Sequence, residues 1–202
     1  MYTLSRDQWT TRTMVKVSIM AVIAFILMFF EFPLLWIAPP FIKIDISDLP
    51  ALLGAFAMGP MVGVIIQLLK NVLNVVLEGS TTGGVGEFAN FVVGSAFAYT
   101  AGAIYFKKKT FGRAIAGLLI GTIVMTAVIT VANYYFIFPF YAKLFGMPIQ
   151  TLVDMGAGIS SKITDLWSLM IYSIVPFNLL KGIILSAITI LLYKKVSPIL
   201  HR

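Results

Sequence analysis

Polar side chains inside long apolar stretches are the residues of this sequence that could do chemistry. Burying a polar side chain in a bilayer costs free energy, so the few that occur there are candidates for a functional role. Asn178 and Lys181 are three residues apart and therefore share one face of a helix. Lys181 lies about 13 residues before Lys194, roughly 20 Å along a helix, too deep for its ammonium to reach the nearer membrane surface. It needs a carboxylate, a carbonyl or a ligand acceptor, and we expect Glu87 as its partner.

Three further polar residues are expected at the same end of the predicted helices. Glu87 and Asn90 share one face at the start of an apolar run, and Asn133 lies beside Tyr134 and Tyr135 near the end of the next run. Glu87 alone is also explained as a helix-capping carboxylate, and the whole set as a polar network that holds helices together. Amide and lysine donors beside many aromatic residues favour a pocket for a neutral, flat, hydrogen-bonding small molecule.

Several other kinds of chemistry find little support in the residue types. The chain has no cysteine, and its single histidine, His201, is the penultimate residue, so we predict no metal site, no catalytic residue and no cofactor. No Gly-xxxx-Gly-Lys-Ser/Thr pattern occurs, so energy for any uptake must come from a partner that hydrolyses ATP. Asp45 and Asp48 are the only close carboxylate pair, and they leave an integral-membrane enzyme open as an alternative.

The elements that position these residues are predicted to be membrane-spanning helices. Hydrophobic residues make up 59% of the 202 residues and charged residues only 11%, against about 25% charged in an average soluble domain. Apolar runs of about 20 residues are long enough to cross a bilayer. The sequence predicts an all-α integral membrane protein with six transmembrane helices, the second of them short: 14–37, 49–59, 61–78, 87–107, 113–140 and 166–194.

The basic residues predict how these helices are oriented. With six helices, ten of the 15 basic residues fall on one side, and an excess of Lys and Arg marks the cytoplasmic side. Residues 1–13 are then a cytoplasmic segment, 14–195 the membrane domain and 196–202 a cytoplasmic tail. The net charge of +7 is a topology signal, so no nucleic-acid partner is expected. The basic residues on this side are Arg6, Arg12, Lys16, Lys107, Lys108, Lys109, Arg113, Lys194, Lys195 and Arg202.

Three segments of the sequence resemble a known family. Lys43 to Gly54, read as KIDISDLPALLG and followed by Gly59-Pro60, resembles the substrate-binding (S) components of energy-coupling factor (ECF) vitamin transporters. The segments 83–91 (GGVGEFANF) and 176–182 (PFNLLKG) are similar to its riboflavin-specific members. The resemblance implies a six-helix fold, a vitamin pocket near the outer face, and a complex with a membrane-embedded coupling protein and two cytoplasmic ATPase subunits.

The resemblance also implies which residues bind ligand and partner. The ligand pocket is formed by the first outer loop and the fourth to sixth helices, and small residues on the first helix form the docking surface, where the family's Ala-xxx-Ala pattern is altered. The expected substrate-binding residues are Lys43, Ile44, Asp45, Leu49, Glu87, Asn90, Asn133, Asn178 and Lys181. The expected docking residues are Ser18, Ala21, Val22 and Ala24.

The function expected from these features is high-affinity riboflavin binding by the membrane subunit of an ATP-driven importer in the cell membrane. An isoalloxazine edge alternates carbonyls and ring nitrogens, which complement amide and lysine side chains. The first outer loop, bracketed by Pro39-Pro40 and Pro50, is expected to be a lid over the pocket mouth. An S component for another vitamin such as thiamine, and an integral-membrane enzyme, are the alternatives.

Overall fold

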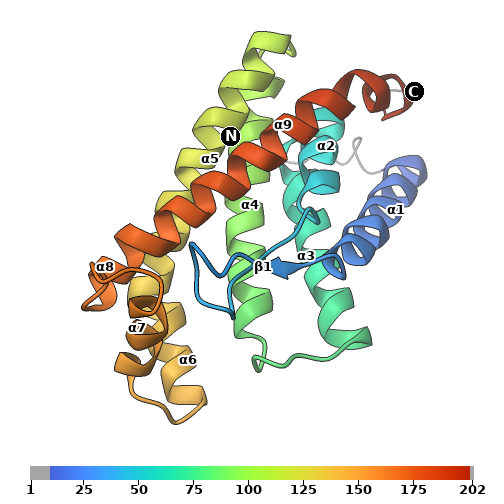
Figure 1. Ribbon diagram of the computed structural model, residues 1–202. Helices are drawn as coiled ribbons and strands as arrows, with labels where there is room; N and C mark the ends of the chain where they lie inside the picture. The colour runs from blue at the N-terminus through green and yellow to red at the C-terminus, as the bar shows by residue number, and fades with distance from the viewer. Residues whose placement is uncertain (1–9, 201–202) are drawn as a thin grey trace.

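The computed structural model describes residues 10–200, with side chains up to residue 193, and is a bundle of membrane-length helices (Figure 1). Five helical stretches are long and apolar enough to cross a membrane, and Leu49–Met58 is a shorter apolar helix, so the all-α membrane fold is confirmed. Residues 1–9 and 201–202 of the predicted cytoplasmic segments lie outside the described part. The elements are α1 Thr11–Met28, β1 Phe32–Pro33, β2 Lys43–Ile44, α2 Leu49–Met58, α3 Pro60–Leu77, α4 Val85–Phe106, α5 Phe111–Ala132, η2 Asn133–Ile137, α6 Phe138–Leu144, α7 Ile149–Ala157, α8 Leu166–Leu169, η3 Met170–Ile174 and α9 Val175–Leu200.

The first helix ends nine residues earlier than its apolar run predicts. α1 stops at Met28, and Phe32 and Pro33 form a short antiparallel pair with Lys43 and Ile44 instead. Pro33 lacks a backbone donor and disfavours helix in the residue before it, which explains why an apolar stretch is not helical here. The chain between residues 29 and 48 is therefore a long loop.

α2 and α3 form a tight hairpin, as the predicted break at Gly59-Pro60 requires. Gly59 has φ +119°, a backbone conformation that side chains disfavour, and Pro60 is the first residue of α3. A Cβ on Gly63 would lie 2.9 Å from the Ala51 carbonyl oxygen, so the backbones of the two helices approach closely at this glycine. The predicted division into two helices is confirmed.

The last two spans are longer than predicted, and each contains a π-helical turn. α5, η2 and α6 run continuously through residues 111–144, and α8, η3 and α9 run through 166–200. The short helix α7 lies between them. Asp165 caps α8 by accepting from the backbone N–H of Ser168, which holds the pKa of this exposed carboxyl below its usual value.

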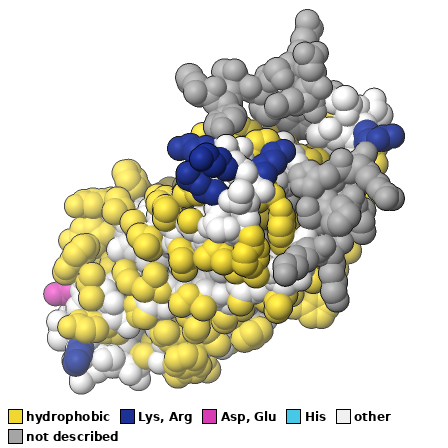
Figure 2. All heavy atoms as spheres, turned by 90° about the horizontal axis from the view of Figure 1, so that it is seen from above, with side chains coloured by type: hydrophobic (Ala, Val, Ile, Leu, Met, Phe, Trp, Pro, Cys, Tyr) yellow, Lys and Arg dark blue, Asp and Glu magenta, His cyan; other side chains and the backbone are white. Residues whose placement is uncertain are grey.

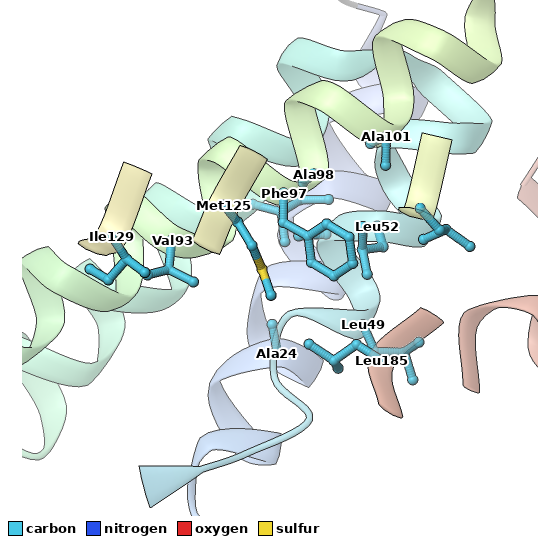
Figure 3. Close-up of a cluster of buried hydrophobic side chains, with 14 of the residues drawn as sticks. Ala24, Leu49, Leu52, Val93, Phe97, Ala98, Ala101, Met125, Ile129 and Leu185 are labelled. Atoms are coloured by element: carbon cyan, nitrogen blue, oxygen red, sulfur yellow. The ribbon is translucent and has the colours of Figure 1, made fainter. Parts of the chain in front are cut away.

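The hydrophobic core lies where α2, α4, α5 and α9 meet (Figure 3). Phe97 of α4 is fully buried, and its ring lies between Met125 of α5 and Leu52 of α2. The small residues Gly117 and Gly121 serve packing inside the chain, since a Cβ on Gly117 would lie 2.7 Å from the Ala101 carbonyl oxygen.

Those of the ten predicted cytoplasmic basic residues that the structure describes belong to segments at one end of the bundle. The start of α1, the α4–α5 turn and the end of α9 all lie toward the top of Figure 1, as an even number of crossings requires. Figure 2, seen from that end, shows Lys and Arg side chains bordered by hydrophobic surface. The assignment of this end to the cytoplasm stays a prediction.

Candidate functional site

A cavity of about 720 Å³ opens toward the end of the bundle opposite the α4–α5 turn. Its walls come from the end of α1, the loop 29–48, the α3–α4 connection, α5 with η2 and α6, and η3 with α9. Segments far apart in the sequence thus build one site of the size that small-molecule ligands occupy.

Seven of the nine predicted substrate-binding residues line this cavity: Lys43, Asp45, Glu87, Asn90, Asn133, Asn178 and Lys181. Ile44 and Leu49 do not line it. Both side chains are apolar and nearly fully buried: Ile44 packs against Ala38 and Phe177, and Leu49 lies in the main core.

The two π-helical turns lie in the cavity wall. η2 begins at Asn133, which is 6% exposed and has no hydrogen bond from its side chain to any described residue. η3 ends at Ile174, whose carbonyl accepts the Asn178 Nδ2–H at 2.8 Å. Single π-turns inside α-helices are frequent at functional sites. This bond leaves the Asn178 carbonyl oxygen available to the cavity.

Lys181 forms an ion pair, but not with Glu87, so the predicted partner is wrong. Lys181 Nζ lies 3.3 Å from Asp45 Oδ2 and 3.0 Å from Asp48 Oδ2. The loop before α2 enters the bundle and brings these carboxylates to α9, so Asp45 and Asp48 are buried although they precede a helix. An ammonium has three donors, and the hydrogen bond to Asp45 leaves Lys181 a donor for a ligand acceptor.

A second lysine completes this buried charge network. Lys70 of α3 is fully buried, and its Nζ lies 2.6 Å from Asp48 Oδ1 and 2.7 Å from Ser47 Oγ. Gln67 Nε2 donates to the same Asp48 oxygen at 2.9 Å. The network holds two lysines and two aspartates and is electrically neutral, which is the condition for burying charges at this depth.

Glu87 belongs to the α3–α4 connection instead. Its Oε2 accepts from Ser80 Oγ at 2.8 Å and from Thr82 Oγ1 at 3.1 Å. These bonds tie the connection to the first turn of α4, and no described backbone N–H donates to the Glu87 carboxylate. Lys43 forms an exposed ion pair with Glu31 across the loop.

Several lining residues were not anticipated from the sequence. Asn74 and Glu78 lie four apart on α3 and are hydrogen-bonded at 2.8 Å, a spacing that marks one helix face. Phe41 and Tyr141 supply aromatic wall, with ring centroids 5.9 Å apart and 24° between their planes. No local sequence pattern predicts that Phe41 contacts Tyr141 of α6, because only the packing of distant segments brings the two rings together.

The predicted docking residues fall on two faces of α1. Ser18 and Val22 are exposed and four residues apart. Ala21 and Ala24 are 1% and 0% exposed and pack inside the chain, so they are not part of its exposed surface. A docking role for Ser18 and Val22 stays a prediction.

Comparisons with known proteins agree with the fold. The family model "ECF transporter, substrate-specific component" matches residues 12–193. The chain is 38% identical to the riboflavin transporter RibU of Staphylococcus aureus (strain TCH60), over 95% of this chain and 93% of that protein. It is 34% identical to the riboflavin transporter FmnP of Bacillus subtilis (strain 168), over 93% of both chains. A solved structure described as "Structure and mechanism of the S component of a bacterial ECF transporter" superposes with a TM-score of 0.73 at 37% identity, covering 95% of this chain and 98% of that one. The family expected from the motifs is confirmed: the chain belongs to the substrate-specific components of ECF transporters, which are multi-pass proteins of the cell membrane.

Proposed function

We propose that this chain is the riboflavin-binding subunit of an ECF importer and takes the vitamin from the outer face. The observation that carries the proposal is the gathering of Asn133, Asn178 and Lys181 at the buried end of one cavity with aromatic walls. The relatives named riboflavin transporters support the choice of ligand. A transporter component is not an enzyme, so the enzyme alternative is set aside.

The polar groups at the buried end match the imide edge of an isoalloxazine. The Asn178 carbonyl oxygen suits the ring N–H, and the remaining Lys181 donor suits a flanking carbonyl. The aromatic and aliphatic walls suit the flat faces of the ring. Binding at nanomolar affinity, about −12 kcal/mol, requires that nearly all of the ligand be buried, and a cavity of about 720 Å³ is large enough to do so.

The energy for import is proposed to come from partner proteins. The sequence has no phosphate-binding loop of the ATPase type. A membrane-embedded coupling protein with two cytoplasmic ATPase subunits would supply it. The exposed face of α1 with Ser18 and Val22 is the proposed contact, because a small residue such as Ser18 lets another helix approach closely in lipid.

Ligand binding by the purified full chain tests the proposal. Riboflavin is expected to bind with quenching of flavin fluorescence, and thiamine is expected not to compete. Asn178→Ala is expected to weaken riboflavin binding by at least ~1 kcal/mol, about fivefold. Binding of thiamine instead of riboflavin would overturn the choice of vitamin.

Asn71→Ala is the matched control for Asn178→Ala. Asn71 is also buried, and its Nδ2 donates to the carbonyl four residues earlier at 2.8 Å, as Asn178 does. Asn71 does not line the cavity. The two variants should lose similar stability, whereas only Asn178→Ala should lose affinity. Equal affinity in both variants would show that Asn178 is a structural residue.

A further inference from the structure

The cavity has three places where an anionic ligand group could be held. Lys43 and Lys181 are the two cationic side chains in its lining. The third place is the N-terminal turn of α4, a helix of 22 residues whose first residues line the cavity. Free N–H groups and the helix dipole make such a terminus attractive to phosphate.

Each cationic side chain is already neutralised by carboxylates of the protein. Lys43 is paired with Glu31, and Lys181 with Asp45 and Asp48. The buried pairing of Lys181 is the stronger case, since two carboxylates and Lys70 together form a network without net charge. A phosphate at Lys181 would leave a buried carboxylate without its cation, which is costly. A phosphate at Lys43 would have to displace Glu31 from its exposed ion pair.

The helix terminus is occupied as well. The backbone N–H groups of Gly84 and Gly86 donate to Ser80 Oγ at 2.7 Å and to Thr82 Oγ1 at 2.9 Å. The same two hydroxyls donate to the Glu87 carboxylate, which is in the first turn of α4. The protein thus places its own anion where a phosphate would be held.

Two carboxylates in the lining have no cationic partner. Among the described residues, Glu78 and Glu87 form no ion pair; Glu78 accepts from Asn74, and Glu87 from hydroxyls. At the buried end, Asn133 has a side chain without a hydrogen-bond partner among these residues, which suits an uncharged polar ligand group. The residues that line the cavity therefore carry more negative than positive charge.

We propose that Glu78 and Glu87 make this cavity selective for the uncharged vitamin and disfavour its phosphate ester, flavin mononucleotide. The inference rests on the proposed function and adds the charge state of the ligand to it. A phosphate monoester carries about −1.5 to −2 charges at pH 7. Whichever way the ligand lies, its phosphate meets either a lysine that is already paired or the unpaired carboxylates near the mouth. Neutral ribityl hydroxyls, in contrast, can donate to those same carboxylates.

The test compares the dissociation constants of riboflavin and flavin mononucleotide for the reconstituted full chain. The wild type is expected to bind the phosphate ester at least tenfold more weakly than riboflavin. Glu78→Gln/Glu87→Gln keeps the shape of both side chains and removes two charges, and should narrow this ratio about tenfold. Asp154→Asn, which removes an exposed charge on α7 outside the cavity, is the control and should leave the ratio unchanged.

Each outcome decides a different point. Equal dissociation constants of the wild type for flavin mononucleotide and riboflavin would overturn the inference. A ratio of these constants that is unchanged in the double glutamine variant would also overturn it, because exclusion of the phosphate ester would then be steric. If the double variant does not fold, raising salt from 0.05 to 0.5 M in the wild type should narrow the ratio, because salt screens repulsion between exposed charges; an unchanged ratio would again overturn it. Failure of the wild type to bind riboflavin would refute the proposed function instead.

Discussion

Replacing Lys70 by Met tests whether the buried charge network stabilises the fold. Met has a similar length and no charge, so the change leaves Asp48 with one lysine partner instead of two. Both Lys70 and Asp48 have fully buried side chains. Lys70 does not line the cavity, so its first effect should be on stability.

The size of the effect follows from the bonds that remain. Removing one partner of a buried ion pair costs about 3–5 kcal/mol. Asp48 keeps Lys181 and Gln67, so we expect a loss near the lower limit, about 3 kcal/mol. At about 2–4 °C per kcal/mol for a chain of this size, the melting temperature should fall by about 6–12 °C.

The assay is thermal unfolding in detergent, with an exposed ion pair as control. Lys43→Met breaks the pair with Glu31, whose side chains are 43% and 42% exposed, and should cost less than about 1 kcal/mol. In Lys70→Met/Asp48→Asn the network is again neutral, because the Lys181–Asp45 pair remains. This double variant should recover at least half of the loss.

A double variant that is less stable than Lys70→Met would refute the reasoning. It would show that the contacts of Asp48 with Lys181 and Gln67 stabilise the fold more than restoring neutrality does. The side chain of Asp48 does not cap α2, so loss of a cap cannot produce that outcome.

Three further predictions concern the loop, the helix contact and the docking face. Riboflavin should protect backbone amides from hydrogen exchange at residues 40–43 more than at 44–48, because residues 44–48 are already largely buried. Residues 107–113 should be unaffected, and protection there alone would mean that the ligand binds at the end of the bundle opposite the cavity. Gly182→Ala should destabilise the chain by about 1–3 kcal/mol in thermal unfolding, because its Cβ would lie 2.4 Å from Thr122 Cγ2, and Thr122→Ala in the same chain should recover part of the loss. Val22→Trp should reduce uptake by vesicles that contain the complete importer without changing the dissociation constant for riboflavin, and unchanged uptake would exclude this face from docking.

The helices could be predicted from the sequence because a bilayer demands long apolar runs, whatever the details of packing. The break at Gly59-Pro60 was predictable for a local reason, the special backbone of both residues. The end of α1 was not, since the apolar residues after Met28 continue the run while Pro33 and the strand pair end the helix. The π-turns leave no trace in hydropathy, because one extra residue per turn does not change composition.

The site was predictable in its residue types and not in its pairings. The depth of Lys181 correctly indicates that it needs a partner, but Asp45 lies 136 residues earlier in the chain. No spacing rule reaches across that separation. Lys70 shows the same limit, because its role depends on a loop that enters the bundle next to it.

The order of the charged residues along the chain also determines how the protein can enter the membrane. A lysine inserted alone at the centre of a helix costs about 2.5–3.5 kcal/mol. Asp48 and Lys70 are 22 residues apart on the α2–α3 hairpin, so they can neutralise each other as soon as that hairpin has been synthesised. Lys181 meets its carboxylates only when the last helix emerges, and its integration into the bilayer therefore depends on a hairpin that the ribosome completed about a hundred residues earlier.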